Sequence, residues 1–453
     1  MTSPRDMNER ELLEQKPWYN PGKWYTTPAT WLPEVRATMP DLPKEIHIQD
    51  VTLREATTNI SVFLNVEQKV EIARRLNDIG VLSLDCGYAG NADDEEAVKR
   101  IIAAGVVKKP TRILMDLVCY DISKEADALK KASDRVAEIN ATAFCPVVKH
   151  RPRNAAELDS YLEVFRYIKE NHPDLEIYMG FIMTSGGMYY FNNLPSTRSN
   201  FDWQVELAKL VTEAGVDRIN LADSEGIASP PAWKYIAGQF RKAIGPNKGL
   251  QVHNHNDYGQ ALANALAAVE GGANWLDVSV CGLGHRAGNT ALEEAVMAIE
   301  ALYGVKTGVR LESLYAVCKY VQEVSGAKVQ PWKAIVGDKI WYESASASGN
   351  LMQLKREGKD FFEAGEEVWN PKVVGQTHRI LFGKESMAFY GSGAANPAVV
   401  EGFLKHLGLK SDKGTIANIM QAILKEIEKR GAQGQDRFLT EEEVNEMCKT
   451  MAK

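Results

Sequence analysis

The stretch LQVHNHNDYGQALANALAAVEGGANWLDVSVCGLG, residues 250–284, contains the alternation that decides the fold. LQVHNHND and WLDVSVCGLG are short segments with β-branched residues, which is typical of buried strands. Between them, GQALANALAAVEGG has apolar residues three and four positions apart and ends in glycine, which predicts a helix. A strand, a helix and a second strand in this order predict a βαβ unit with parallel strands.

The same alternation runs about eight times from Glu45 onward, which is the number of units in a TIM barrel of about 260 residues. An open, doubly wound sheet is the alternative, but no glycine-rich phosphate loop follows the first strand. We therefore predict the α/β class and a TIM (β/α)8 barrel. The six remaining strands are predicted at EIHIQDVTL (45–53), VLSLDCG (81–87), RILMDLVC (112–119), RVAEINATAF (135–144), EIYMGFIM (176–183) and DRINLADSEG (217–226).

Two further regions flank the predicted barrel domain of residues 45–305. Residues 1–44 contain WYNPGKWYTTPATWLPEV, in which aromatic residues alternate with Pro and Gly, and we predict an aromatic N-terminal arm there. Residues 306–453 lack the strand–helix alternation and predict a helix-rich accessory region. Its final helical pair is expected at ANIMQAILKEIEKRG and TEEEVNEMCKTM.

The composition excludes several classes of protein. A net charge of −7 gives no general attraction for nucleic acid or an anionic membrane. The first residues, MTSPRDMNER, lack an apolar signal segment, and no later stretch has the length of a membrane span. Six cysteines without a CxxC pair indicate reduced thiols. We expect a cytoplasmic protein that binds neither nucleic acid nor membrane.

The histidines of HNHND carry the strongest signal for a metal site. Residues two apart in a strand share a face, so His253, His255 and Asp257 are expected to point into the barrel lumen. A lone histidine is more often a satisfied core residue, but active sites of this fold lie at the carboxyl ends of the strands. The sequence therefore predicts that His253 and His255 bind a divalent metal.

The string DVTLREATT, residues 50–58, would end the first strand, which neighbours the eighth in a closed barrel. It is expected to place Arg54 on the same face as Asp50, with Glu55 at the rim. Glu55 with two histidines forms a facial ligand set that leaves positions open for substrate. Asn289, in GLGHRAGN, could add a neutral oxygen ligand. Without the histidines, a salt-bridged pair of Arg54 and Glu55 would be the simpler interpretation.

These three strings together resemble the metallolyase superfamily of TIM barrels, which includes the 2-isopropylmalate, homocitrate and citramalate synthases and, more distantly, hydroxymethylglutaryl-CoA lyase. The resemblance extends over about residues 45–445. It implies that Arg54 contacts a keto group, that Glu55 is a metal ligand, and that Ser224 in LADSEG replaces a substrate-binding threonine. The segment NPKVVGQTHRILFGKES resembles the accessory region that follows the barrel in the synthases.

The chain departs from the family pattern at positions that matter for chemistry. Ala56 stands where the first motif has glycine, and the expected glutamine is replaced within TTN. His285 replaces the glutamate of GERAGN. The pattern HESGIH reads YESASA, so that Tyr342 and Ala347 stand where histidines are expected. Around the fifth strand the family residues give way to GGMYYFNNLPSTR, residues 186–198. The keto-acid pocket and the apparatus for proton removal are therefore expected to differ from those of the family.

The resemblance implies a metal-dependent condensation of an acyl-CoA, expected to be acetyl-CoA, with a 2-oxo acid. A carbon–carbon lyase or aldolase is the alternative, and a silent metabolite-binding homologue is a third. One metal ion is expected, of the class of zinc, manganese, magnesium or iron, in a homodimer. His378 is a further candidate base. The expected substrate-binding residues are Arg54, Ser224, Asp85 and Thr142, and the expected catalytic residues are Arg54, His285, Tyr342 and Glu343.

Overall fold

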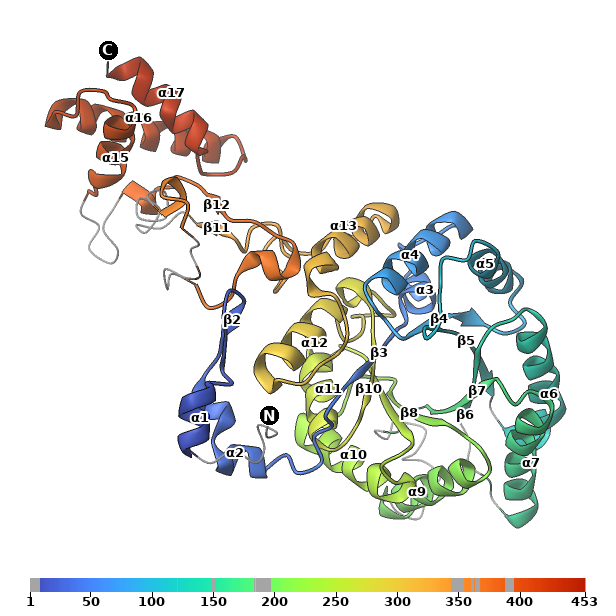
Figure 1. Ribbon diagram of the computed structural model, residues 1–453. Coiled ribbons are helices and arrows are strands. Elements are labelled where there is room, and N and C mark those ends of the chain that lie inside the picture. Colours follow the sequence, from blue (N-terminus) through green and yellow to red (C-terminus); the bar gives the residue numbers. More distant parts are fainter. Residues whose placement is uncertain are drawn as a thin grey trace. The chain divides into compact units, whose positions relative to one another are not determined.

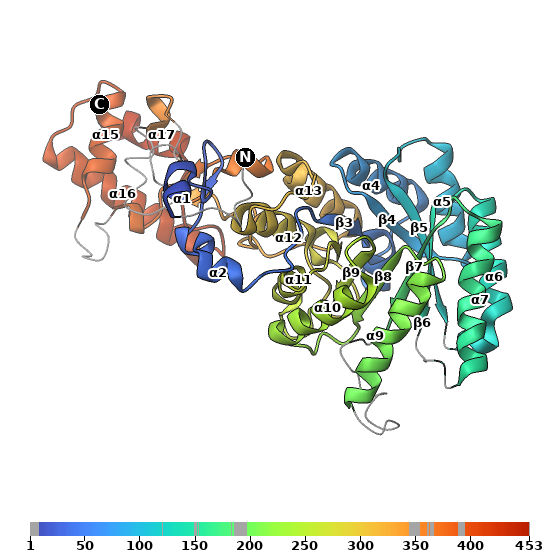
Figure 2. The same cartoon turned by 60° about the horizontal axis from the view of Figure 1, so that its bottom comes forward.

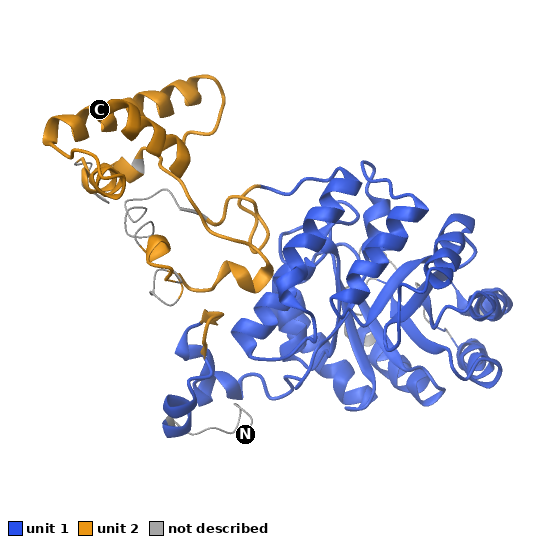
Figure 3. Ribbon diagram, turned by 45° about the horizontal axis from the view of Figure 1, so that its top comes forward, with its two compact units in different colours: residues 1–18, 26–330 blue, residues 19–25, 331–453 orange. Residues whose placement is uncertain are grey.

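The computed structural model describes residues 9–119, 121–148, 152, 154–182, 184, 197–343, 354–359, 362, 367–387 and 395–452. The chain divides into two compact units (Figure 3). Unit 1 contains Met1–Trp18 and Thr26–Gln330, and unit 2 contains Tyr19–Tyr25 and Pro331–Lys453. No helix among the described residues is long and apolar enough to cross a membrane.

Unit 1 is built on a closed barrel of parallel strands, which confirms the predicted TIM barrel. The barrel closes where the last strand pairs with the first, with Trp275 opposite His47 and Val278 opposite Asp50. Figures 1 and 2 show the helices as a ring around the strands. The strands are β3 (His47–Asp50), β4 (Ser83–Tyr88), β5 (Arg112–Cys119), β6 (Ala143–Val148), β7 (Glu176–Phe181), β8 (Arg218–Asp223), β9 (Gly249–Asn254) and β10 (Trp275–Val278).

The helices of the ring begin at polar caps and bury one apolar face. At the start of α4 (Val66–Asp78), the side chain of Asn65 accepts a hydrogen bond from the backbone N–H of Gln68. The side chain of Gln68 accepts one from the backbone N–H of Asn65, and the two bonds form a capping box. Ile72 and Leu76, four residues apart, lie buried on its inner face. The ring helices are α4 (Val66–Asp78), α5 (Ala92–Ala103), α6 (Ile122–Glu138), α7 (Ala155–Asn171), α9 (Thr197–Glu213), α10 (Pro230–Ile244), α11 (Ala261–Glu270) and α12 (Leu292–Ala298).

The predicted fourth strand, residues 135–144, was placed too early in the chain. Residues 135–138 form the last turn of α6, in which Val136 is buried one heptad after Leu129. Asn140 then takes a left-handed conformation with φ of 62°, and β6 begins only at Ala143. The apolar side chain of Val136, on the buried face of α6, therefore resembles the start of the strand that follows.

Several other strands, among them β3 and β9, end earlier than the sequence suggested. β3 ends at Asp50, whose carboxylate accepts the backbone N–H of Thr52 at 2.9 Å. This bond joins the end of β3 to the first residue of a helical turn, α3 (Thr52–Glu55), which continues into η3 (Ala56–Thr58). β9 likewise ends at Asn254, before the second histidine of HNHND. The carboxyl ends of both strands are thus followed at once by turns that carry polar side chains.

The amino-terminal end of the barrel is filled by Arg218, which is 1% exposed. Its guanidinium carbon lies 3.2 Å from the ring centre of Trp275 and 3.9 Å from that of Tyr178. Arg218 also donates to the Gln251 side chain at 2.8 Å. Because packed side chains fill this end, groups available for chemistry gather at the carboxyl end.

The rest of unit 1 follows the barrel or precedes it. Trp31 is 2% exposed and packs so closely on Gly304 that a Cβ atom at Gly304 would lie 2.3 Å from the Trp31 ring. This part of the aromatic arm therefore packs on its own unit. These elements are α1 (Glu9–Gln15), η2 (Pro28–Trp31), α2 (Pro33–Ala37), η4 (Val280–Gly282), η5 (Ile299–Tyr303), η6 (Leu311–Ser313) and α13 (Leu314–Ser325).

Unit 2 has its own hydrophobic core, in which Phe382 and Phe403 contact each other at 4.9 Å between ring centres. Trp24, from the arm, forms a backbone bridge with Trp369. The predicted final helical pair is present as α16 and α17. The elements of unit 2 are β1 (Tyr19–Asn20), β2 (Trp24–Tyr25), β11 (Tyr342–Glu343), β12 (Arg379–Ile380), η7 (Pro371–Val374), η8 (Glu385–Met387), α15 (Ala398–His406), α16 (Lys413–Ala432) and α17 (Glu441–Met451).

Candidate metal centre

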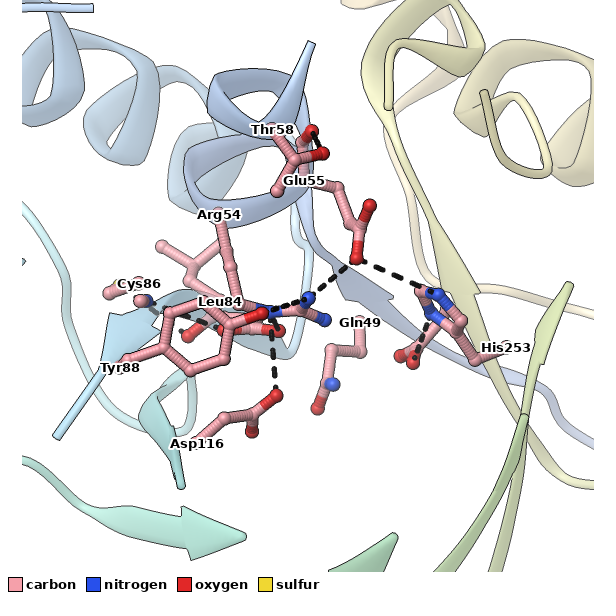
Figure 4. A network of polar contacts seen from close by, with 12 residues as sticks. Gln49, Arg54, Glu55, Thr58, Leu84, Cys86, Tyr88, Asp116 and His253 are labelled. Carbon is pink, nitrogen blue, oxygen red and sulfur yellow. Dashed lines mark hydrogen bonds and ion pairs between the residues drawn. The ribbon is translucent and has the colours of Figure 1, made fainter. Parts of the chain in front are cut away.

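Three buried side chains converge at the carboxyl end of the barrel. Glu55 lies in the helical turn α3 and His253 in strand β9. His255 directly follows the last residue of β9. One potential ligand atom of each lies within 4.8 Å of those of the other two. The Nε2 atom of His253 is 3.2 Å from Nε2 of His255 and 3.9 Å from Oε1 of Glu55 (Figure 4 shows the latter pair). The structure thus brings together the three residues expected to bind metal.

Asn289 joins this cluster from the loop that follows β10. Its Nδ2 atom lies 3.2 Å from Nε2 of His253, and its backbone pairs with that of His255. Glycines allow the loop to approach so closely, because a Cβ atom at Gly284 would lie 1.8 Å from the Asn289 side-chain oxygen. The predicted ligand set of two imidazoles, one carboxylate and one amide is therefore assembled in one place.

The chemistry of these donors fits a divalent cation. Burial and the nearby His253 lower the pKa of His255 to about 3, so its imidazole is neutral and can act as a ligand. Burial opposes ionisation of Glu55, but the charges of Arg54 and His253 lower its pKa to about 2. The side-chain oxygen of Asn289 is buried without a hydrogen-bond partner among the described residues. A cation among them would satisfy this oxygen and separate two Nε2 atoms that otherwise face each other.

Asp277 orients His253, and the sequence did not reveal this role. Its carboxylate lies 3.1 Å from Nδ1 of His253 and is 1% exposed. Burial would lower the pKa of His253, but the hydrogen bond and charge of Asp277 outweigh this effect and raise it. A proton on Nδ1 leaves Nε2 directed toward Glu55 and His255, as in many metal sites. The only signal in the sequence was an isolated acid inside the apolar strand WLDV.

Asp277→Asn should weaken metal binding about 10- to 100-fold, because an amide holds the His253 ring less firmly and makes it a weaker ligand. Calorimetric titration of the full chain with Mn²⁺ would measure this change. The matched control is Asp134→Asn, since Asp134 contacts His172 at 2.6 Å and so forms another carboxylate–histidine pair. Equal affinities of the wild type and Asp277→Asn would refute the role of Asp277.

Arg54 lies beside the candidate ligands among acidic groups (Figure 4). Its guanidinium contacts Glu55 and Asp85, each at 2.5 Å, and Asp116 at 3.4 Å. It also lies 3.4 Å from the hydroxyl of Tyr88. Asp116 and Tyr88 were not predicted, although Asp116 is the only charged residue within the strand segment ILMDLV. The ion pair of Arg54 with Glu55, which the sequence offered only as an alternative to metal binding, is one part of this larger network.

The carboxylates around Arg54 exceed the positive charge that Arg54 supplies. Burial raises the pKa of Asp85 to about 6, although the charge of Arg54 lowers it. Burial and the charge of Asp85 raise the pKa of Asp116 well above its usual range. The environment of Asp85 and Asp116 therefore favours their neutral forms, beside the candidate metal ligands.

Comparison with known proteins establishes the family. The HMGL-like family pattern matches residues 45–321, which is more than half of the chain. The chain belongs to the HMGL-like family. The 2-isopropylmalate synthase of Methanocaldococcus jannaschii is 31% identical over 399 residues, covering 87% of this chain and 70% of that protein. The homocitrate synthase AksA of Methanopyrus kandleri is 30% identical over 389 residues, covering 84% and 88%.

Solved structures of HMGL-like proteins share the barrel. The hydroxymethylglutaryl-CoA lyase of Pseudomonas aeruginosa superposes with a TM-score of 0.51 at 18% identity, covering 64% of this chain and 95% of that one. The lyase of Brucella melitensis gives 0.51 at 17% identity, with 63% and 100% covered. At these identities the likeness concerns the fold alone.

Two other residues expected in the site of this HMGL-like chain lie near the candidate ligands. The backbone N–H of exposed His285 donates to Glu55 at 3.4 Å, and its ring centre is 6.3 Å from that of His255. Ser224 follows β8, and its carbonyl accepts from Arg286. Asp257 was expected to face the lumen with the histidines. It instead lies in the turn beyond β9 and forms an ion pair with Arg286 at 2.6 Å.

The remaining expected residues are Thr142, at the other end of the barrel, and three residues that belong to unit 2. Thr142 directly precedes β6, so it lies at the amino-terminal end of the barrel, and its hydroxyl accepts the backbone N–H of Ile113 at 2.8 Å. Tyr342 and Glu343 form β11 of unit 2. His378, also in unit 2, contacts the carboxylate of Glu367 through Nε2. Ala347 and residues 186–196 of the fifth-strand loop lie outside the described residues.

Proposed function

We propose that this chain is a divalent-metal-dependent acyltransferase that condenses an acyl-CoA, acetyl-CoA in the first instance, with a 2-oxo acid. The observation that carries the proposal is the buried cluster of Glu55, His253, His255 and Asn289 beside Arg54. Support also comes from relatives named as 2-isopropylmalate and homocitrate synthases, which match most of the chain. A cation held by the four ligands would act as a Lewis acid toward the keto group.

Arg54 would bind the oxo acid and stabilise the negative charge that develops on its keto oxygen when carbon attacks. Its contacts with Glu55 and Asp85 hold the guanidinium in place before substrate arrives. Asp85 would shape the substrate site through this contact, and the Ser224 hydroxyl would hold the substrate carboxylate. Because Arg54 is already surrounded by acids, little reorganisation is needed as the charge forms.

Removing a proton from the acyl group requires a base, which contributes about 10²- to 10⁴-fold. His285 is the first candidate, since it is exposed and its backbone contacts the candidate metal ligand Glu55. Tyr342 and Glu343 are the candidates from the accessory region, where the family pattern HESGIH has become YESASA. This departure is also what favours a carbon–carbon lyase as the second candidate function.

A thiol-release assay tests the proposal and separates the two functions. Full-length, metal-loaded protein is incubated with acetyl-CoA and one 2-oxo acid at a time, and free thiol is followed with a chromogenic disulfide. We expect thiol release that depends on one oxo acid and is absent in His253→Ala. Formation of an oxo acid from a hydroxy-diacid without CoA would instead establish the lyase and overturn the synthase.

A further inference from the structure

A second group of metal-binding side chains lies in unit 1, outside the cluster just described. It consists of Cys281, Glu293 and Cys318, whose potential ligand atoms all lie within 4.8 Å of one another. Glu293 and Cys318 are completely buried and Cys281 is 8% exposed. Cys281 lies in η4 after β10, Glu293 in α12 and Cys318 in α13. The packing of these three elements thus brings together residues that are distant in sequence.

Hydrogen bonds link the members of this group to one another and to Gln322. Oε2 of Glu293 lies 3.7 Å from Sγ of Cys318 and accepts the backbone N–H of Cys281 at 3.0 Å. The side-chain amide of Gln322 donates to Sγ of Cys281 at 3.7 Å and to the carbonyl of Cys318 at 3.1 Å. An amide N–H directed at a cysteine sulfur stabilises a thiolate, as do the outer hydrogen bonds of many metal sites.

We propose that Cys281, Glu293 and Cys318 form a second metal site, which takes a thiolate-preferring divalent cation of the zinc class. Two sulfurs and one carboxylate suit such an ion, whereas magnesium and calcium prefer oxygen donors throughout. Burial, with Cys281 and Glu293 close by, raises the pKa of the Cys318 thiol well above its usual range. Because cysteine binds a metal as the thiolate, binding of the cation displaces the proton of the Cys318 thiol.

The second metal site would fix the turn at Cys281, which precedes the loop that carries the candidate ligand Asn289. Cys281 has a left-handed backbone, with φ of 60° and ψ of 10°, which is costly for a residue other than glycine. The next residue, Gly282, accepts the backbone N–H of Asn289 at 3.0 Å. A cation joining Cys281 to α12 and α13 would fix this turn and thereby the position of Asn289. Its function is structural, and it does not depend on the reaction proposed above.

Cobalt titration of the full chain distinguishes the two sites, because the ligands of the first contain no sulfur. A thiolate bound to Co²⁺ gives a charge-transfer band in the near ultraviolet, so this band reports only the second site. We expect the height of the band to correspond to one Co²⁺ ion bound at the second site per protein molecule. The band should persist in His253→Ala. It should be lost in Cys281→Ser/Cys318→Ser and kept in Cys448→Ser, which changes a buried cysteine of unit 2.

Two measurements keep the test decisive if the double variant does not fold. Glu293→Gln preserves the side-chain shape and should weaken Co²⁺ binding about 10-fold or more. In wild-type protein, Zn²⁺ should slow alkylation of Cys281 and Cys318, mapped by mass spectrometry, more than that of Cys448. Absence of the charge-transfer band in the wild type, or its persistence in a folded double variant, would overturn the second site without affecting the proposed reaction.

Discussion

His253→Ala should abolish metal binding at the first centre and lower turnover about 1000-fold or more. A Lewis acid contributes several kcal/mol to such a reaction, and each 1.4 kcal/mol corresponds to about tenfold in rate. Nε2 of His253 lies within 4 Å of each neighbouring donor group, Glu55, His255 and Asn289, so its loss opens the middle of the ligand set. No other described side chain contacts all three.

The measurement is calorimetric titration with Mn²⁺, which prefers the nitrogen and oxygen donors of this centre to the thiols of the second site. Thiol release with the oxo acid identified in the screen gives the turnover. His406→Ala is the matched control, because His406 is an exposed histidine of α15 in unit 2. Unchanged Mn²⁺ affinity in His253→Ala would show that the metal is bound elsewhere, and unchanged turnover would remove the metal from the reaction.

Arg54→Lys should lower kcat/KM for the oxo acid about 100- to 1000-fold, the cost of removing one donor to a developing oxyanion. A lysine ammonium is a single point charge and cannot bridge Glu55, Asp85 and Asp116 as the planar guanidinium does. Arg54→Met should in addition destabilise the fold by about 3–5 kcal/mol, since buried carboxylates lose their cation. Arg54 is 11% exposed, so solvent screens little of this effect.

Steady-state kinetics and urea unfolding separate the two effects of Arg54. The matched control is Arg100→Lys, because Arg100 pairs with Glu67 on the surface at 3.3 Å and both side chains are more than half exposed. That change should leave stability within about 0.5 kcal/mol of the wild type. If Arg54→Lys retained full kcat/KM, the guanidinium of Arg54 would not be needed to stabilise the oxyanion, whatever the stability of the variant.

The sequence by itself determined the barrel and its polar end. Alternating strands and amphipathic helices are local patterns, and each can be read within a window of about 15 residues. The spacing of His253 and His255 could be interpreted in the same way, because two residues separated by one position keep similar directions at a strand end. The glycines around Asn289 likewise marked a loop that approaches another backbone closely.

Only the tertiary structure decided how the groups of the site meet. Arg54 and Glu55 come from a helical turn whose first residue, Thr52, donates its backbone N–H to Asp50, and no periodicity distinguishes such a turn from the end of a strand. Asp116 and Asp277 were single acids in apolar strands, and their partners Arg54 and His253 lie 62 and 24 residues away along the chain. The grouping of Cys281 with Cys318 has the same origin. Such contacts depend on closure of the barrel and on the packing of helices around it, which bring together residues that no local pattern relates.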